Sequence, residues 1–393
     1  MKVLVINCGS SSLKYQVIDM DNKEMICKGT YERIGEESFL THKINGEKYV
    51  LEHPVKNHQE ALDFSIKQLL NEEYPAIKSL DEIGAIGHRT PHGGEKFKGA
   101  VLIDDAVLAD IQSFESLAPL HIPACIHGIK ACKELMPGKP NVAVFDTAFH
   151  QSITAEKYIY SLPYDLYEKF GVRKYGFHGT SHKYVAKRIS ELLGRDDLKI
   201  INCHLGQGAS LCAIDGNKSV ETSMGMTPVA GIPMCARSGD LDPSIVTFIM
   251  KKENLKPEEM DMILNKESGL YALSAVGNDC RDIQAAADEG NERAIMALKH
   301  YHYKIAQYIA EYIVALGGVD VITFTAGVGE NQIAIRKGIL ENLKFFGVKV
   351  DDERNQIKDE GRISADDSSV DVWVVPTNEE LEIAEETLEV LGE

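Results

Sequence analysis

Short apolar runs rich in β-branched residues alternate along the chain with segments of helical periodicity. Such runs lie at 2–6, 84–87, 142–145, 319–324 and 371–375, and each is predicted to be a buried strand. The segment after the first run, 15–19, is predicted to pair with it as a hairpin. This alternation is typical of an α/β protein.

Two helices are predicted from their boundary residues. One spans 291–316, with Asn291 as its N-cap and Gly317 and Gly318 as its stop. The other begins near the C-terminus, where Thr377 and Glu380 have the spacing of a capping box. Its apolar face is formed by residues at helical spacing, namely Leu381, Ala384, Leu388 and Leu391.

The hairpin sequence occurs twice. Residues 5–19 and 200–215 both read as strand, small-residue turn and strand, and both end in Ile-Asp. The repeat predicts two related domains facing each other, each with one phosphate-binding hairpin, although chance similarity between two buried hairpins is the alternative. We expect an N-terminal domain over 1–150, completed by a C-terminal helix at 379–393, and a nucleotide-binding domain over 151–378.

Composition and charge narrow the function. A chain of 393 residues with 44% apolar and 26% charged residues is expected to be globular and to form two domains. Its net charge of −18 disfavours nucleic acid and anionic membranes as partners, since both require a positive field. If the substrates are anions, any positive potential must be local.

The location is predicted to be cytoplasmic. Only four apolar residues follow Lys2 before a polar segment, which is too short for a signal peptide, and no apolar run approaches the roughly 18 residues of a membrane span. The eight cysteines include no C-x-x-C pair, so they read as reduced thiols and not as disulfides or a zinc site.

Three small-residue turns are candidate phosphate sites. In 7–14 the backbone amides and three serine hydroxyls could surround phosphate oxygens, and Lys14 adds positive charge. In 204–210 two glycines allow close backbone approach to a ligand. In 324–331 a strand passes into a helix through two glycines. A purely structural turn is the alternative for each.

Charged residues at strand ends and in turns are candidates for binding or catalysis. Arg89 and Arg237 could each hold a carboxylate or phosphate through two hydrogen bonds, with a surface salt bridge as the alternative. Asp146 follows a buried strand, where a carboxylate is costly without a metal, an arginine or a reacting group. His178 could donate to a phosphoryl oxygen. Its i, i+4 spacing from His182 would also suit zinc, but Gly179 disfavours a helix start there.

Together these stretches resemble the acetokinase family, the short-chain acyl kinases of the actin-like ATPase superfamily. The resemblance covers nearly the whole chain, through the blocks N-C-G-S-S-S-L-K, H-R-x-x-H-G-G, A-P-L-H, F-D-T-A-F-H, Y-G-F-H-G-T-S-H, H-L-G-x-G-A-S, T-S-M-G-M-T-P, R-S-G-D-L-D-P, F-T-A-G-V-G-E-N and P-T-N-E-E-L. It implies two duplicated actin-like (ribonuclease H-like) domains with a cleft between them, and a homodimer.

The resemblance also implies an activity. This is reversible, Mg²⁺-dependent transfer of a phosphoryl group from ATP to acetate, giving acetyl phosphate and ADP, with Mn²⁺ as a substitute metal and propionate or another short-chain acid as the alternative acceptor. Transfer would be direct and in line, with the charge on the equatorial oxygens neutralised by arginines, a histidine, a lysine and the metal.

The resemblance assigns roles residue by residue. Asn7 and Glu379 would hold Mg²⁺, Asp146, His178 and Arg237 would be catalytic, and Arg89 would bind substrate. The remaining substrate contacts would come from Pro91, Leu120, His121, Phe177 and Pro228. The nucleotide would contact Ser10, Ser12, Lys14, His204, Leu205, Gly206, Gln207, Gly208, Asp279, Cys280, Arg281, Gly327, Val328, Gly329, Glu330 and Asn331.

The chain departs from the family pattern at four places, none of them a residue assigned to chemistry. Gln207 stands where relatives usually have Asn, Pro91 where they commonly have Val, and Ile122 where they have Asn. The stretch 229–236 lacks the usual acidic residue and Gly-Thr. The first two bear on the phosphoryl donor and on the acyl-chain preference.

Two other function classes fit parts of the pattern. A sugar or glycerol kinase of the same superfamily would need a general base near a polar pocket instead of two arginines. A non-catalytic nucleotide-binding module would keep the turns but would have no use for Arg89, Arg237 and His178 together.

Overall fold

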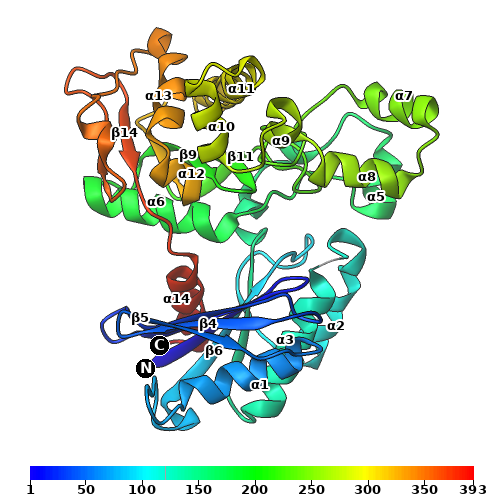
Figure 1. Ribbon diagram of the computed structural model, residues 1–393, viewed down its shortest axis with the longest axis vertical. Coiled ribbons are helices and arrows are strands. Elements are labelled where there is room, and N and C mark those ends of the chain that lie inside the picture. The colour runs from blue at the N-terminus through cyan, green and yellow to red at the C-terminus, as the bar shows by residue number, and fades with distance from the viewer. Residues whose placement is uncertain (120) are drawn as a thin grey trace. The chain divides into compact units, whose positions relative to one another are not determined.

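The chain divides into two compact α/β units. The computed structural model describes residues 1–119 and 121–393, and it separates Met1–Phe149 with Asn378–Glu393 (unit 1) from His150–Thr377 (unit 2) (Figure 1). Each unit contains one main sheet. No helix in the described part of the chain is long and apolar enough to cross a membrane.

Unit 1 is built on an eight-stranded sheet of order β5-β4-β3-β2-β1-β6-β8-β7. The strands β1, β6 and β8 run parallel to one another, and the others are antiparallel to their neighbours. The strands are β1 (Lys2–Cys8), β2 (Leu13–Asp19), β3 (Glu24–Glu32), β4 (Phe39–Ile44), β5 (Glu47–Glu52), β6 (Ile83–Thr90), β7 (Val101–Leu102) and β8 (Asn141–Phe145).

Both faces of this sheet are covered because β1 is apolar on both sides. Leu4 and Ile6 pack into a cluster with α1 (His58–Leu69) and α3 (Ile122–Leu135), while Val3 and Val5 pack against α14 (Glu379–Leu391). Figure 1 shows α14 across the sheet from α1 and α3. The helix α2 (Asp105–Ser113) packs on α3. A continuous apolar run is what a strand buried on both faces requires.

Unit 2 is built on a six-stranded sheet of order β11-β10-β9-β12-β14-β13. The strands are β9 (Lys199–Leu205), β10 (Ala209–Asp215), β11 (Lys218–Thr222), β12 (Val321–Thr325), β13 (Gly361–Arg362) and β14 (Asp371–Val374). The helices are α4 (Ala155–Tyr158), α5 (Tyr164–Phe170), α6 (Gly179–Leu193), α7 (Pro243–Glu253), α8 (Pro257–Lys266), α9 (Gly269–Ser274), α10 (Cys280–Asp288), α11 (Glu292–Leu316), α12 (Ala326–Asn331) and α13 (Ile333–Glu341).

The two faces of the unit 2 sheet differ in polarity. The odd-numbered residues of β9, among them Ile201 and Cys203, join the apolar core that α11 covers. The even-numbered residues Asn202 and His204 point to the other face, where they bond to residues of α6. Because side chains alternate along a strand, the same strand builds the core on one side and a polar site on the other.

Most of the predicted elements are confirmed. The five apolar runs fall on β1, β6, β8, β12 and β14, and α11 has the predicted bounds. The Asn291 side chain accepts from the first turn of α11, and Gly317 adopts φ +64° at its end. The two hairpins have the same arrangement, since β1–β2 and β9–β10 are antiparallel and each first strand has a parallel neighbour.

Two helix starts differ from the prediction. The N-cap of α14 is Asn378, whose Oδ1 accepts from Leu381 N, and not Thr377. Thr377 is instead held in unit 2, where its hydroxyl bonds to Ser181 and its N–H to Glu330. The helix α6 does begin at Gly179, because His178 takes up the left-handed conformation at φ +57° immediately before it.

Candidate functional site

In unit 1 the predicted residues lie at one edge of the sheet. Asn7 is near the end of β1, Arg89 near the end of β6, and Asp146 directly after β8. These three strands are parallel and adjacent, so their carboxyl ends meet at the same edge. The Asp146 N–H donates to Thr90 O at 2.9 Å, which continues the β6–β8 pairing to the site.

Arg89 and Asp146 form a partly buried ion pair. Arg89 Nη2 donates to Asp146 Oδ2 at 2.9 Å, and the Asp146 side chain is 1% exposed. The negative charge of Asp146 raises the pKa of Arg89, with a further contribution from Glu379. Arg89 Nε is buried and has no hydrogen-bond partner among the described residues, so this guanidinium keeps a donor available for a second anion.

Glu379, the first residue of α14, adds a second carboxyl group at this edge. Burial, and then the nearby charge of Asp146, raise the pKa of Glu379 to about 7, against the opposing charge of Arg89. The charge of a neighbouring carboxylate disfavours ionisation of Glu379, and a bound divalent cation would favour it. Together with the amide oxygen of Asn7, the two carboxyl groups offer the oxygen ligands that Mg²⁺ prefers, so the residues fit a divalent cation.

The turn between β1 and β2 is short and held from both sides. Gly9 N–H donates to Ser12 O at 2.8 Å, and Gly9 O bonds to the ring of His58 on α1 at 2.6 Å. A Cβ at Gly9 would lie 2.7 Å from Ser12 Oγ, so a larger residue there would require the Ser12 side chain to move. Ser10 and Lys14 are exposed and can face a ligand. Sequence reasoning missed His58, which no motif marks.

The predicted acyl-pocket residues are split between the units. In unit 1, Pro91 is buried directly after β6 and His121 is exposed at the start of α3, while Leu120 lies outside the described residues. In unit 2, Phe177 belongs to the apolar core, and the Pro228 carbonyl faces Arg237 Nη1 at 3.5 Å. Their role in an acyl pocket stays a prediction.

Most of the predicted nucleotide residues of unit 2 share one hollow. Its volume is about 500 Å³, and its walls come from the turn after β9, the start of α10 and the α12 region. Gly206, Gln207, Asp279, Cys280, Arg281, Gly327, Val328 and Asn331 line it, together with Cys235, Asn278, Gln332 and Lys358, which were not predicted. His204, Leu205, Gly208, Gly329 and Glu330 do not line it.

Glu330 and Arg336 explain how α12 is held beside this hollow. The Glu330 carboxylate accepts from Ala326 N at 2.8 Å, at the start of its own helix. Arg336 is fully buried, and its guanidinium donates to Gly329 O and Glu330 O at 2.9 and 2.7 Å and to Asn355 O at 2.7 Å. The side chain of Glu330 is therefore committed to structure, and sequence reasoning missed Arg336.

His178 immediately precedes α6 and lies close to two other histidines, His182 and His204. Its ring stacks on that of His204 with centroids 4.1 Å apart, and its Nδ1 lies 2.9 Å from Ser210 Oγ. His182 is buried, and its Nε2 also bonds to Ser210 Oγ, at 2.8 Å. The i, i+4 spacing of His178 and His182 therefore serves a hydrogen-bond network on the sheet face.

Arg237 is a cation that lacks a carboxylate partner among the described residues. Its Nη1 has only long contacts, to Pro228 O at 3.5 Å and to Met234 Sδ at 3.7 Å. Burial lowers its pKa below the ordinary value for arginine. A Cβ at Gly208 would lie 3.0 Å from Arg237 Nη1 and 3.6 Å from His178 Nε2, so these two side chains share one corner beside the turn.

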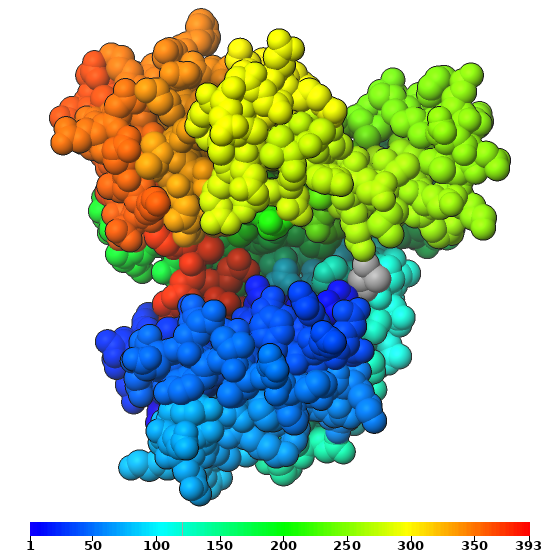
Figure 2. Space-filling view, in the orientation of Figure 1, coloured from blue at the N-terminus to red at the C-terminus, as the bar shows by residue number. Residues whose placement is uncertain are grey.

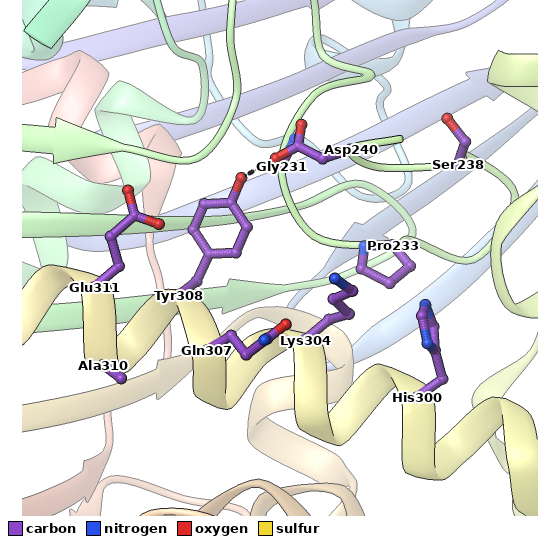
Figure 3. A pocket seen from close by; sticks show the side chains of 10 residues that line it. All are labelled: Gly231, Pro233, Ser238, Asp240, His300, Lys304, Gln307, Tyr308, Ala310 and Glu311. Carbon is purple, nitrogen blue, oxygen red and sulfur yellow. Dashed lines mark hydrogen bonds between the residues drawn. The ribbon is translucent and has the colours of Figure 1, made fainter. Parts of the chain in front are cut away.

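The loop that carries Arg237 closes on itself at its base. Gly231 N–H donates to an Asp240 carboxylate oxygen at 2.8 Å, and Asp240 N–H donates to Gly231 O at 2.8 Å. Tyr308 of α11 donates to the other oxygen of Asp240 (Figure 3). A second hollow of about 500 Å³ lies between this loop and α11.

Comparison with known proteins places the chain in a family. A model of the acetokinase family matches residues 2–385. The acetate kinase of Clostridium novyi (strain NT) is 55% identical over 100% of this chain and 98% of that protein. The crystal structure of Porphyromonas gingivalis acetate kinase has a TM-score of 0.96 at 45% identity, over 99% of both chains. A propionate kinase from Francisella tularensis has a TM-score of 0.94 at 38% identity, over 99% of both chains.

These matches extend over the whole length and include both units with their sheets. The fold is therefore the two-domain actin-like ATPase fold, and the chain belongs to the acetokinase family.

Proposed function

We propose that the protein is an acetate kinase, which transfers a phosphoryl group reversibly between ATP and acetate by direct in-line displacement. The observation that carries the proposal is the corner of unit 2 where Arg237, His178 and Gly208 meet. There a half-buried guanidinium with no carboxylate partner in the described chain lies beside an imidazole and a glycine turn. Such a set is suited to an anion that carries several oxygens.

The charge balance supports phosphoryl transfer to an acid rather than to an alcohol. Both reactants are anions, so their repulsion has to be neutralised as charge spreads over the equatorial oxygens. Arg237 and His178 supply donors from unit 2, and Arg89 supplies its Nε from unit 1. An alcohol acceptor would instead need a general base, and the only buried carboxylate proposed for catalysis, Asp146, is already paired with Arg89.

Mg²⁺ is the proposed metal, with Mn²⁺ as a substitute. Asn7 and Glu379 would hold it, with Asp146 beside them, and when bound it would neutralise charge on the phosphate oxygens. Asp146 has a second role in this scheme, because its ion pair fixes the Arg89 guanidinium at the sheet edge. The pair thus orients Arg89 toward the carboxylate of the acceptor.

The nucleotide is proposed to lie in the hollow of unit 2. The turn at 206–208 would approach its phosphates, while Asp279–Arg281 and 327–331 would lie along the rest of ATP or ADP. In unit 1, Ser10, Ser12 and Lys14 are proposed as further phosphate contacts. Glu330 would act indirectly in this scheme, since its carboxylate holds α12 and not the ligand.

Acetate is preferred over propionate as the proposed acceptor because the more similar relatives are acetate kinases, although a propionate kinase also matches along the whole chain. The decisive assay traps the product with hydroxylamine, because only an acyl phosphate yields a hydroxamate. Initial rates are measured with acetate, propionate and butyrate, each against ATP, GTP and pyrophosphate. We expect the highest kcat/KM for acetate with ATP, and no hydroxamate with any acid would refute the proposal.

Two further proposals concern assembly and location. We propose a homodimer that forms through unit 2. The helices α7 and α8 form a lobe at the side of this unit (Figure 2). The apolar side chains Ile245, Phe248 and Met262 of these helices are exposed. Light scattering should give twice the mass of one chain, and Phe248→Glu should lower the measured mass.

The cytoplasm is the proposed location, as the substrates ATP and acetate are found there.

A further inference from the structure

A chain of four side chains leads from the core of unit 2 to His178. It runs from Thr323 on β12 through Asn202 on β9 and His182 on α6 to Ser210 on β10. All four side chains are fully buried. Buried polar groups without partners destabilise a fold, so such a chain persists only where every member is bonded.

The first link sets the direction of the chain. Thr323 Oγ donates to Asn202 Oδ1 at 2.8 Å, so the oxygen of this amide faces β12. The Asn202 amide nitrogen then faces His182 Nδ1, at 2.8 Å. An amide nitrogen can only donate, so His182 Nδ1 is the acceptor.

The next two hydrogen bonds follow because a neutral imidazole and a hydroxyl group can each donate one hydrogen bond and accept another. Burial lowers the pKa of His182 well below its ordinary value, so the ring is neutral and its one proton is on Nε2. Nε2–H therefore donates to Ser210 Oγ at 2.8 Å. The Ser210 hydroxyl has one hydrogen, and His178 Nδ1 lies 2.9 Å away to accept it.

We infer that this chain fixes neutral His178 as the tautomer that carries its proton on Nε2. Thr323, Asn202, His182 and Ser210 are then positioning residues that act through His178. Its Nε2 lies on the side of Gly208 and Arg237, where the proposed phosphoryl group binds. The inference deepens the proposed function, on which the identity of that anion rests.

The tautomer matters because the two nitrogens have opposite polarity. A neutral ring with its proton on Nε2 presents a donor to a phosphoryl oxygen. The other tautomer would present a lone pair to that oxygen and would oppose binding and transfer. Stacking on His204, whose Nδ1 bonds to Ser181, holds the plane of the His178 ring while Ser210 sets its protonation.

The direct test is the NMR spectrum of the ring. Protein labelled on histidine with ¹³C and ¹⁵N is studied at about pH 8, and the His178 signal is assigned by its loss in His178→Gln. We expect the shifts of an Nε2–H ring in the parent protein. In Ser210→Ala the share of the Nδ1–H tautomer should rise several-fold. An Nδ1–H ring in the parent, or no change in Ser210→Ala, would overturn the inference.

Two further variants serve as a control and as a replacement for Ser210→Ala. Ser190→Ala removes a buried serine from the same helix as His182 but outside the chain, so it should leave the spectrum of His178 unchanged. If Ser210→Ala does not fold, Thr323→Val replaces it, because it frees the Asn202 amide to turn over. The Nδ1–H share of His178 should then also rise, and an unchanged share would contradict the inference.

Kinetics give a second readout that a loss of stability would not produce. Ser210→Ala should lower kcat about tenfold with the KM for ATP within about twofold, since only the donor to the transferring group is disturbed. In a His178→Ala background the same change should have no further effect on kcat. An equal loss in both backgrounds would show that Ser210 does not act through His178. If His178 shows the expected tautomer but the protein forms no hydroxamate, the proposed function is contradicted and the inference about the tautomer is not.

Discussion

At the scale of single residues, the two arginines of the site are in different electrostatic states. Arg89 is held by the buried Asp146 carboxylate, which raises its pKa, whereas burial lowers the pKa of Arg237, which has only long contacts to a carbonyl and a sulfur. Arg89 is thus oriented before a ligand binds. The positive charge of Arg237 is not neutralised by a carboxylate among the described residues, which favours binding of an anion. The chemistry assigned to each differs accordingly.

Replacing either arginine should impair turnover severely. Arg237→Ala and Arg89→Ala are each expected to lower kcat by roughly 10²–10⁴-fold, as loss of a preorganised donor usually does. Steady-state rates of acetyl phosphate formation check this. Arg195→Ala is the matched control, since that arginine forms a surface pair with Asp197 and should retain full activity. Near-normal rates for Arg89 and Arg237 would contradict the assignment.

Pro91 should influence the choice of acid. It is buried directly after β6, two residues beyond Arg89, at a position where relatives commonly have valine. We expect Pro91→Val or Pro91→Ala to change the ratio of kcat/KM for acetate to that for propionate by several-fold, because one methylene in an apolar pocket is worth about 1–3 kcal/mol. An unchanged ratio would place the acyl pocket elsewhere.

At the scale of elements, the backbone geometry of the loop from Gly231 to Asp240 positions the side chain of Arg237. Gly231 adopts φ +102°, and a Cβ there would lie 2.7 Å from Ser223 O. Gly239 adopts φ +67°, and a Cβ there would lie 2.6 Å from Gly231 O. The loop is thus closed by contacts that only glycine permits, and Asp240 locks its base.

Tyr308 should contribute to the rate through this loop. Its hydroxyl donates to Asp240, and it is the link from α11 to the loop in Figure 3. Tyr308→Phe is expected to lower kcat about fivefold, a modest effect because Asp240 is exposed to water. Tyr303→Phe, on an exposed face of the same helix, is the control and should have no effect. An equal kcat for both variants would show that the loop holds Arg237 without α11.

At the scale of the whole molecule, a strongly acidic chain keeps several histidines buried and neutral. Burial lowers the pKa of His88 to about 4 and likewise that of His42, both in unit 1. Between that value and the ordinary 6.5, the unfolded chain binds protons that the folded chain does not. Stability therefore falls as pH drops through this window, and it is fully present above it.

The loss of stability at low pH should be measurable, and part of it should depend on His88. For His88, a shift from 6.5 to about 4 corresponds to roughly 3 kcal/mol of unfolding free energy by pH 4. Urea unfolding followed by far-ultraviolet circular dichroism should show a midpoint that decreases from pH 7 to pH 4, with a shallower decrease in His88→Gln. The same slope in both proteins would mean that His88 does not titrate in this window.

The helix and strand pattern could largely be predicted from the sequence, because it depends on local periodicity. Buried strands such as β1 and β12 are apolar runs, and α11 carries its own N-cap and glycine stop. The N-cap of α14 lies one residue later than the sequence predicts, because Thr377 has the right chemistry for a cap but bonds elsewhere. Its partners, Ser181 and Glu330, come from distant parts of the chain.

The candidate site was predicted in part, and the missing part has a physical cause. Asn7, Arg89 and Asp146 end parallel strands, so their types and positions sufficed to mark them. His58, Arg336 and Tyr308 support the site through single contacts with distant segments, and no local pattern identifies such contacts.

The sequence by itself determined the α/β class, the repeated hairpin and the types of charged groups at the strand ends, because these follow from periodicity and from the chemistry of each side chain. Only the tertiary structure decided which of these groups are paired and which are not. It joined Arg89 to Asp146, left Arg237 with long contacts, and linked His178 through Ser210 to the core. Electrostatic state depends on distance and burial, and those are properties of the folded chain.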